Sequence, residues 1–574
     1  MMTRPLFAQN VFLEVNMNNQ MLQSMFRSAR ARSILEIHRV IERAGDDDKI
    51  AGIVLNISSY QGGQETLWEL RNALEKFKAK GKKICVFISN ANLDMYSLAT
   101  VADKIVMDDL GVLTLLGYSW GRGYAQHSLE KLGVGVRELR YFEFKSAAET
   151  YTRDSLSDAD RRQYGQILDD IMSHTRNTIT TARFWTNAEF DSILNNEFMF
   201  SAKSALERGL VDRTGRSAAV LEAIREISDG KPAGSFYIYG PPASSVTGSK
   251  FRYKPARSRS GNSASPVIAV IYANGVTDME QGVAAWTLAQ TIREVSENRQ
   301  VKAIVLRMNS PGGSAEAADY VAEAVKAAKE RVPVVVSMGS VAASGGYWAS
   351  MTASHIVASP VTMTGSIGVI GSWFYDNGLN SKLGLTVDVM RRGAHADLGT
   401  GMILPTRNLN QAEEARYRQY IMDLYADFTA RVAENRGLDI ERVEALAQGR
   451  VYSGQGALNA GLIDSIGGLD DALRVARELA GISENRVVGY SEFPKLKFFD
   501  RMLEYFMVKK VFLGRNFAPA GSPATAGSPA TVGEAALFAA DLILPAPLLD
   551  DLRYRISHNG QVMPILPLDS GWQW

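Results

Sequence analysis

The chain has 574 residues, a length that at roughly 100–200 residues per domain indicates several domains. Apolar residues make up 46% of it and charged residues 22%, which excludes a disordered or collagen-like protein. The 63 basic and 62 acidic side chains leave a net charge of +1, so the charge gives no reason to expect a nucleic-acid partner. Cys85 is the single cysteine, which excludes an intrachain disulfide and a thiolate metal cluster. We expect neither a metal nor an organic cofactor.

The sequence contains no run of the ~18 apolar residues that a membrane-spanning helix needs. Its most apolar segment, Ala535 to Leu549, is interrupted by Asp541, Pro545 and Pro547. The first residues also lack the charged and then apolar pattern of a secretion signal. We therefore expect no transmembrane span in the given chain.

Two halves of the chain resemble each other at a nearly constant spacing. At an offset of 251 residues, Ile53-Val54-Leu55 matches Ile304-Val305-Leu306, and Tyr96 matches Tyr347. At an offset of 252, the set Ala205, Gly209, Leu210, Asp212 and Gly215 matches Ala457, Gly461, Leu462, Asp464 and Gly467. This period is far too long for a solenoid, so the sequence predicts a tandem duplicated domain.

Within each half, β-branched runs alternate with amphipathic segments, which is typical of a mainly parallel sheet with helices packed outside. In the second half we expect strands at Val267–Ile271, Ala303–Met308 and Val332–Met338, and helices near Ala284–Glu297, at Ala315–Glu330 and from about Ser344. The predicted fold class is therefore α/β. The predicted organisation is a first unit at 1–239, a basic linker rich in Ser, Pro and Gly at 240–266, a second unit at 267–490, and an amphipathic segment with a low-complexity tail at 491–574.

The most informative segment, residues 337–348, leads from a buried strand through a turn of small residues into a helix. It places Ser344 at the start of that helix, where the next backbone N–H, that of Gly345, has no partner within the helix. A second turn, at Gly312-Gly313, ends the preceding strand and allows another amide to approach a substrate. Together these features fit a serine nucleophile beside a two-donor oxyanion hole. An N-cap serine and an ordinary glycine turn would give the same pattern.

A serine nucleophile needs a base, and two candidates remain. Among the histidines, we keep His395 as a rival base. The repeat offers Lys145: position 93, which matches Ser344, is Leu93, and position 396, which matches Lys145, is Ala396. Each half has therefore kept one member of a Ser–Lys pair and lost the other. The alternative is that Lys145 is an ordinary surface lysine.

A lysine acts as a base when burial without a counter-charge lowers its pKa from about 10.4. The neighbours that would bury Lys145 are Phe142, Phe144, Ala147 and Ala148. Glu143 and Glu149 would oppose this effect if they pointed inward. A further candidate is Ser366 in a glycine-rich turn, whose hydroxyl could orient the lysine amine or bond only its own backbone.

Four segments of the chain resemble the long form of peptidase family S49, the signal peptide peptidases. They are Phe144–Glu149, Asn309–Ser314, Ala343–Trp348 and Thr364–Gly368, and the resemblance covers about residues 11 to 490. It implies a Clp-protease/crotonase-like fold, Ser344 as nucleophile, Lys145 as general base, and a homotetramer. The implied substrates are signal-peptide remnants and other hydrophobic peptides, cut at the bacterial inner membrane on its periplasmic side.

Long-form members of that family usually begin with a membrane span, whereas this chain starts where the first strand is expected. We therefore expect either a truncated start or another mode of attachment. From Lys495 to Arg515, basic residues are mixed with an apolar stripe, and Phe499, Met502 and Phe506 fall on one helical face. Such a helix would either lie on an anionic bilayer surface or pack against protein.

Two other functions stay open at this point. A crotonase-type acyl-CoA enzyme would share the oxyanion geometry, but it needs acid/base carboxylates, and only Glu316 and Asp319 follow the Gly312-Gly313 turn closely. A non-catalytic scaffold would tolerate replacement of Ser344. We expect a Ser–Lys endopeptidase that acts on peptides through an acyl-enzyme.

Overall fold

The computed structural model describes residues 11–17, 33–58, 60, 62–230, 235–239, 245–248, 253, 265–495, 552, 555, 556, 559, 562 and 563. The predicted amphipathic segment after Lys495 and the repeat at 520–531 lie outside the described residues, as does most of the predicted linker. Among the helices that can be described, none combines the length and apolarity required to cross a bilayer.

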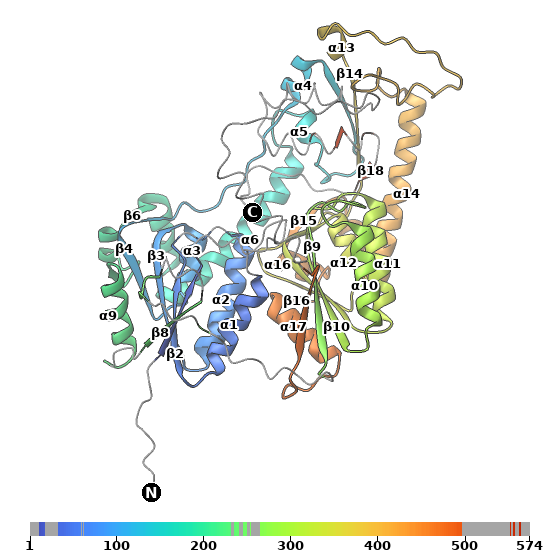
Figure 1. The fold of residues 1–574 in the computed structure, drawn as a ribbon. Coiled ribbons are helices and arrows are strands. Elements are labelled where there is room, and N and C mark those ends of the chain that lie inside the picture. Colours follow the sequence, from blue (N-terminus) through green and yellow to red (C-terminus); the bar gives the residue numbers. More distant parts are fainter. Residues whose placement is uncertain are drawn as a thin grey trace, which may run out of the picture.

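The N-terminal unit is built on one sheet with helices packed against it (Figure 1). Its elements are β1 (Val11–Asn16), α1 (Ile34–Asp46), β2 (Ile50–Asn56), α2 (Gln64–Ala79), β3 (Lys83–Ala91), α3 (Leu93–Ala99), β4 (Lys104–Thr114), α4 (Gln126–Leu132), β5 (Val134–Leu139), α5 (Glu149–Thr152), α6 (Asp158–Arg183), α7 (Asn187–Ser192), the π-helix η1 (Ile193–Glu197), β6 (Met199–Ser201), α8 (Ala202–Glu207), β7 (Arg213–Thr214), α9 (Ser217–Ile227) and β8 (Ser235–Tyr239). The strand order is β6-β4-β3-β2-β1-β8, with β7 paired to β4. These pairs are parallel except β4–β6.

The C-terminal unit repeats this plan. Its elements are β9 (Val267–Asn274), α10 (Ala285–Glu297), β10 (Val301–Ser310), α11 (Ala315–Lys329), β11 (Val334–Ala343), α12 (Gly345–Ser350), β12 (His355–Ala358), β13 (Met363–Gly365), β14 (Ile370–Asp376), α13 (Leu379–Lys382), α14 (Gln411–Arg436), α15 (Ile440–Leu446), β15 (Val451–Ser453), α16 (Gly454–Ala460), β16 (Ser465–Ile466), α17 (Leu469–Leu479) and β17 (Gly489–Phe493). The strand order is β15-β13-β11-β10-β9-β17, with β12 paired to β11 and β16. Here β13–β15 is the antiparallel pair.

The two units share hydrogen bonds as well as topology. Tyr96 Oη donates to the carbonyl of Leu210 at 2.8 Å, and the matching Tyr347 Oη donates to the carbonyl of Leu462 at 2.9 Å. Both tyrosines are buried, so each hydroxyl needs a partner, and the duplicated sequence supplies the same one twice. The predicted α/β fold of two repeats with mainly parallel sheets is thus confirmed.

The strand that leads to Ser344 is longer than predicted. The sequence predicts this strand at Val332–Met338 followed by a turn, but β11 begins at Val334 and continues to Ala343. Its last residues pair with β13, from Val341–Met363 to Ala343–Gly365. The small residues read as a turn are strand residues because a second partner strand is available there. The other five predicted elements of this half are present, with ends shifted by a few residues.

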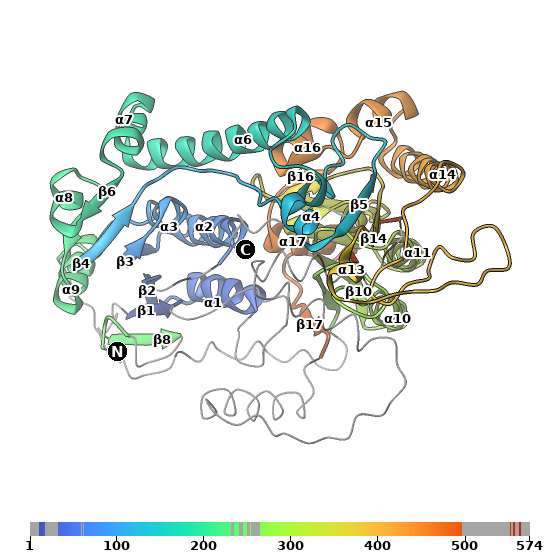
Figure 2. The same ribbon diagram turned by 90° about the horizontal axis from the view of Figure 1, so that it is seen from above.

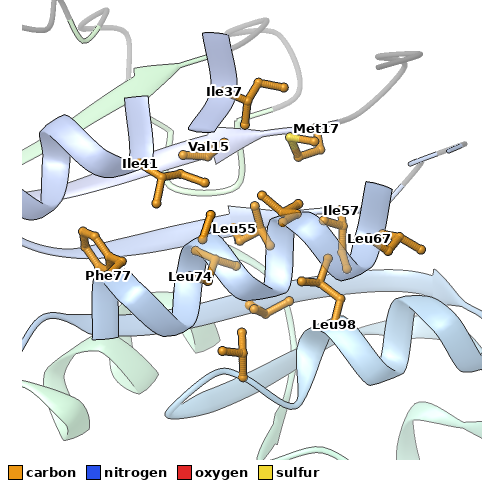
Figure 3. Packing of buried hydrophobic residues seen from close by; sticks show 14 of the residues in the cluster. Val15, Met17, Ile37, Ile41, Leu55, Ile57, Leu67, Leu74, Phe77 and Leu98 are labelled. Atoms are coloured by element: carbon orange, nitrogen blue, oxygen red, sulfur yellow. The ribbon is translucent and has the colours of Figure 1, made fainter. Parts of the chain in front are cut away.

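A continuous hydrophobic core joins the two units. Helices α1 and α2 lie between the N-terminal sheet and α17 with the C-terminal sheet behind it (Figures 1 and 2). Figure 3 shows Ile41 of α1 and Leu74 and Phe77 of α2 packed toward Leu55 of β2. The same cluster includes Val305 of β10 on the far side. Because burial of one such side chain contributes ~1.5–3 kcal/mol, this shared core is a strong link between the units.

A small sheet also crosses between the units. Strand β5 of the N-terminal unit pairs antiparallel with β14 of the C-terminal unit, from Leu139–Gly371 to Val134–Asp376. The described residues of the C-terminal segment return to this sheet, where β18 (Val562–Met563) pairs with β14.

A buried ionic cluster lies at the centre of the interface. The guanidinium of Arg307 on β10 pairs with Glu65 and, at 2.7 Å, with Glu69, both on α2. All three side chains are at most 2% exposed. Arg307 also donates to Ser337 Oγ at 2.7 Å on β11, and Glu69 accepts the N–H of Leu469 at 3.0 Å. The cluster therefore joins an N-terminal helix to the strand that leads to Ser344.

We predict that Arg307→Met lowers the free energy of unfolding by about 3–5 kcal/mol, because it leaves two buried carboxylates without their cation. Arg331→Met is the matched control: it breaks an exposed pair with Glu297 and should cost under about 1 kcal/mol. Urea unfolding followed by circular dichroism measures both. Equal losses in the two variants would contradict a structural role for the cluster.

Candidate active site

Helix α6 of the N-terminal unit extends to the sheet of the C-terminal unit. Figure 2 shows it running from α7 toward α16 of the C-terminal unit. Near its middle, Asp170 accepts a 2.5 Å hydrogen bond from Ser453 Oγ at the end of β15. The chain segment just before α6, residues 140–148, thereby lies against the C-terminal unit.

Ser344 lies between β11 and α12 in a strained backbone conformation. Its φ is 57° and its ψ is −115°, outside the regions that non-glycine residues prefer. The N–H of Ser344 donates to the Gly365 carbonyl at 2.7 Å, and its own carbonyl accepts from Trp348 at 2.8 Å. Such strain costs of order 1–3 kcal/mol and is typical of functional sites. A sharp strand-to-helix turn of this kind presents a serine Oγ to a substrate.

Lys145 reaches Ser344 from the other unit within the same chain. Its Nζ lies 2.6 Å from Ser344 Oγ, 2.8 Å from the carbonyl oxygen of Ser366 and 2.9 Å from Ser366 Oγ. The side chain of Lys145 is 1% exposed, and Ser344 and Ser366 are equally buried. The structure thus brings together three of the residues singled out in the sequence, and these three contacts are all with uncharged oxygens.

Burial lowers the pKa of the Lys145 amine well below its usual value, and the positive charge of Arg555 lowers it further. The two nearby glutamates do not reverse this effect. Glu143 is exposed and pairs with Arg162. Glu149 does point inward, but it pairs with Arg140 and, at 3.6 Å, with Arg122. A neutral amine at this position is the form that can accept a proton.

A glycine permits the close approach of the lysine segment. Gly449 has a φ of +81°, and a Cβ added there would lie 2.5 Å from the Cβ of Lys145. Its N–H donates to the carbonyl of Ile367 at 2.8 Å, and the carbonyl of the preceding Gln448 accepts from Phe144 at 2.9 Å. The loop around Gly449 therefore holds the lysine segment and the Ser366 turn together. The sequence around Gly449 does not predict this role, because the contact joins positions about 300 residues apart in the chain.

The two predicted oxyanion donors flank the same region. Gly345 is the first residue of α12, so its N–H has no partner within that helix. At Gly346, an added Cβ would lie 2.7 Å from the Ser310 carbonyl, so α12 packs directly against the end of β10. Gly313 follows that strand with a φ of +156°, and a Cβ added there would lie only 2.1 Å from the Thr277 carbonyl oxygen. This position therefore requires glycine.

Other candidates lie elsewhere. The rival base His395 has its Nδ1 2.8 Å from Glu413 and a side chain that is 56% exposed. Glu316 and Asp319, the carboxylates considered for acyl-CoA chemistry, both lie in α11, where Asp319 pairs with Arg431 at 2.9 Å. Leu93, the counterpart of Ser344, begins α3 and is buried. The structure thus leaves Lys145 as the base candidate beside Ser344.

The sequence of the chain is similar to those of known proteases. The model of Peptidase family S49 matches residues 76–230 and 326–483, once in each unit. Protease 4 of Salmonella typhi is 32% identical over 481 residues, covering 80% of this chain and 74% of its own. The chloroplastic serine protease SPPA of Arabidopsis thaliana is 29% identical over 473 residues, covering 81% and 68%. A solved structure of a ClpP1 point mutant from Listeria monocytogenes aligns with 36% of this chain and 94% of that one, at 17% identity and a TM-score of 0.25.

The chain belongs to peptidase family S49. It is a serine protease, so the alternative of a crotonase-type acyl-CoA enzyme is wrong.

We predict that Gly449→Ala reduces kcat/KM by about 100-fold, because the new Cβ displaces Lys145 and a shift of about 1 Å at a catalytic group has that effect. The control is Gly437→Ala, at a φ of +62° with open space around it. This variant introduces a similar backbone strain, but its new Cβ has no neighbouring atom to displace. Its kcat/KM should therefore stay at the wild-type value. Assays with a fluorogenic peptide compare the two, and a wild-type rate for Gly449→Ala would contradict the role of this contact.

Proposed function

We propose that the chain is an endopeptidase that works through a Ser344–Lys145 dyad. The 2.6 Å separation of Nζ and Oγ at a buried position carries this proposal. A neutral amine has two N–H donors and one lone pair. The two donors fit the carbonyl and hydroxyl oxygens of Ser366, which leaves the lone pair for the hydroxyl proton of Ser344.

In the proposed reaction, Ser344 Oγ attacks the scissile carbonyl carbon of a peptide while its proton passes to Lys145 Nζ. The backbone N–H groups of Gly345 and Gly313 donate to the oxyanion that forms. The lysine ammonium then protonates the leaving amine, the C–N bond breaks, and an acyl-enzyme remains on Ser344. Lys145 next takes a proton from water as the water oxygen attacks the ester carbonyl. The ester C–Oγ bond then breaks, the proton passes from Lys145 to Ser344 Oγ, and the carboxyl product leaves.

We infer that the substrates are hydrophobic peptides, signal-peptide remnants among them, cut by a homotetramer at the periplasmic side of a bacterial inner membrane. The resemblance of the site segments to long-form S49 peptidases supports this inference. Sedimentation velocity should then give four times the chain mass of 62.9 kDa. The chain should also co-sediment with anionic but not with neutral vesicles. A monomer mass would contradict the tetramer. Equal recovery with both kinds of vesicle would contradict the membrane association.

We predict that Lys145→Ala and Ser344→Ala each abolish peptide hydrolysis and that the double variant is no worse than either. The reason is that the two side chains act as one unit, so their effects do not add. Fluorogenic peptide hydrolysis measures the rates, and mass spectrometry after a fluorophosphonate locates the labelled serine.

Two variants serve as comparisons. His395→Ala should keep the wild-type rate, since this residue contacts Glu413. Ser366→Ala loses one acceptor for the amine but keeps the backbone carbonyl, so a fall of about 10–100-fold is expected. Activity that survives in Lys145→Ala but disappears in His395→Ala would overturn the dyad. Full activity in Ser344→Ala would support a role for the chain other than catalysis at this serine.

A further inference from the structure

Gln163 on α6 is buried at the junction of the two units. Its side chain is 1% exposed and takes part in three hydrogen bonds. Nε2 donates to Asp160 Oδ1 at 2.7 Å and to the Phe144 carbonyl at 3.2 Å, and Oε1 accepts the N–H of Val451 at 3.1 Å. Because one end of the amide faces two acceptors and the other faces a backbone donor, its orientation is fixed.

The partners of this amide belong to the two halves of the site. Phe144 directly precedes Lys145 in the N-terminal unit. Val451 begins β15 of the C-terminal unit and pairs with Gly365 of β13. The Gly365 carbonyl in turn accepts the N–H of Ser344 at 2.7 Å. One side chain therefore spans from the segment that carries the lysine to the sheet that carries the serine.

A second side chain holds the other flank of Lys145. The Arg122 guanidinium donates to the Ser146 carbonyl at 3.1 Å and pairs with Asp160 at 2.8 Å. Asp160 is thus shared by Arg122 and Gln163, and the carbonyls on both sides of Lys145 are each held by one of them. These contacts of Arg122 lie within the N-terminal unit. Gln163 differs because its third bond reaches the C-terminal unit.

We propose that Gln163 is a positioning residue for the Ser–Lys reaction: its amide fixes the Phe144 carbonyl to strand β15 and so holds Lys145 Nζ within reach of Ser344 Oγ. The proposal rests on the dyad described under Proposed function. In this proposal, helix α6 contributes to catalysis through Gln163 as well as packing between the two units.

Loss of this bridge has a defined electrostatic consequence. Once the segment loosens, water reaches the Lys145 amine, and less burial means that its pKa rises toward the ordinary value. The rise of kcat/KM with pH, which follows the neutral amine, then moves to higher pH. Of the charged groups around the segment, Arg555 acts on Lys145 directly, while Arg122, Asp160 and Glu149 pair with one another behind it. Of these four, a change at Gln163 touches Asp160 alone, which loses one hydrogen bond but keeps its pair with Arg122.

The test compares Gln163→Met, which keeps the volume but removes all three hydrogen bonds, with Gln166→Met. Gln166 lies on the exposed face of the same helix, where it donates to Asp170 at 2.9 Å. Fluorogenic peptide hydrolysis is measured over a range of pH, with the folded sites counted by fluorophosphonate titration of Ser344. A second variant, Gln163→Glu, keeps the acceptor for Val451 but cannot donate to Phe144, and it serves if the Met variant does not fold.

For Gln163→Met we expect kcat per titrated site to fall by about 10–100-fold, as for other outer contacts of a site. KM should change by less than about twofold, and the midpoint of the pH profile should move upward. Gln163→Glu should move it in the same direction, and Gln166→Met should match the wild type. A wild-type kcat per site and an unmoved midpoint in the Gln163 variant would overturn the proposal. Full activity in Lys145→Ala would instead overturn the dyad itself, so the two failures are distinct.

Discussion

The contact between Lys145 Nζ and Ser344 Oγ, 2.6 Å long, is the interaction on which the rest of the site depends. The proposed transfer of the serine proton needs an uncharged lysine, and an uncharged lysine needs burial without a carboxylate beside it. The structure meets both needs with Ser366 as the neutral partner of the amine and with Glu149 neutralised by arginines. In the proposed dyad each unit of the duplication supplies one group, because Leu93 stands at the position that matches Ser344 and Ala396 at the position that matches Lys145.

A site split between two units requires that the units do not move relative to each other. Among the described residues, three separate features fix the two units to each other. They are the shared core around α1 and α2, the Arg307 cluster, and the sheet that β5 and β14 form between the units. Helix α6 adds the hydrogen bonds of Gln163 to Phe144 and Val451, next to the Lys145 segment. The Arg307 cluster is of special interest because a buried ion pair gives geometric definition at little net gain in stability. It holds β11, the strand that leads to Ser344, against α2.

The sequence carried enough information for the fold class, the duplication and the two principal site candidates, because these leave periodic or repeated patterns. The spacing of 251 residues was sufficient to align Ser344 with Leu93 and Lys145 with Ala396. The full length of β11 was not predictable, since it depends on pairing with β13. Gly449 and Gln163 were missed for a similar reason: their contacts join positions about 300 residues apart and leave no local signal.

The most direct test of this account is the pKa of Lys145 itself, measured by NMR titration of the lysine side-chain nitrogen in the folded Ser344→Ala variant, with Lys145→Arg used to assign the signal. We expect a midpoint well below the ordinary value for lysine, because burial and Arg555 both disfavour the ammonium. A midpoint at the ordinary value would mean that the amine is charged at working pH and cannot take the serine proton, and the dyad would have to be abandoned.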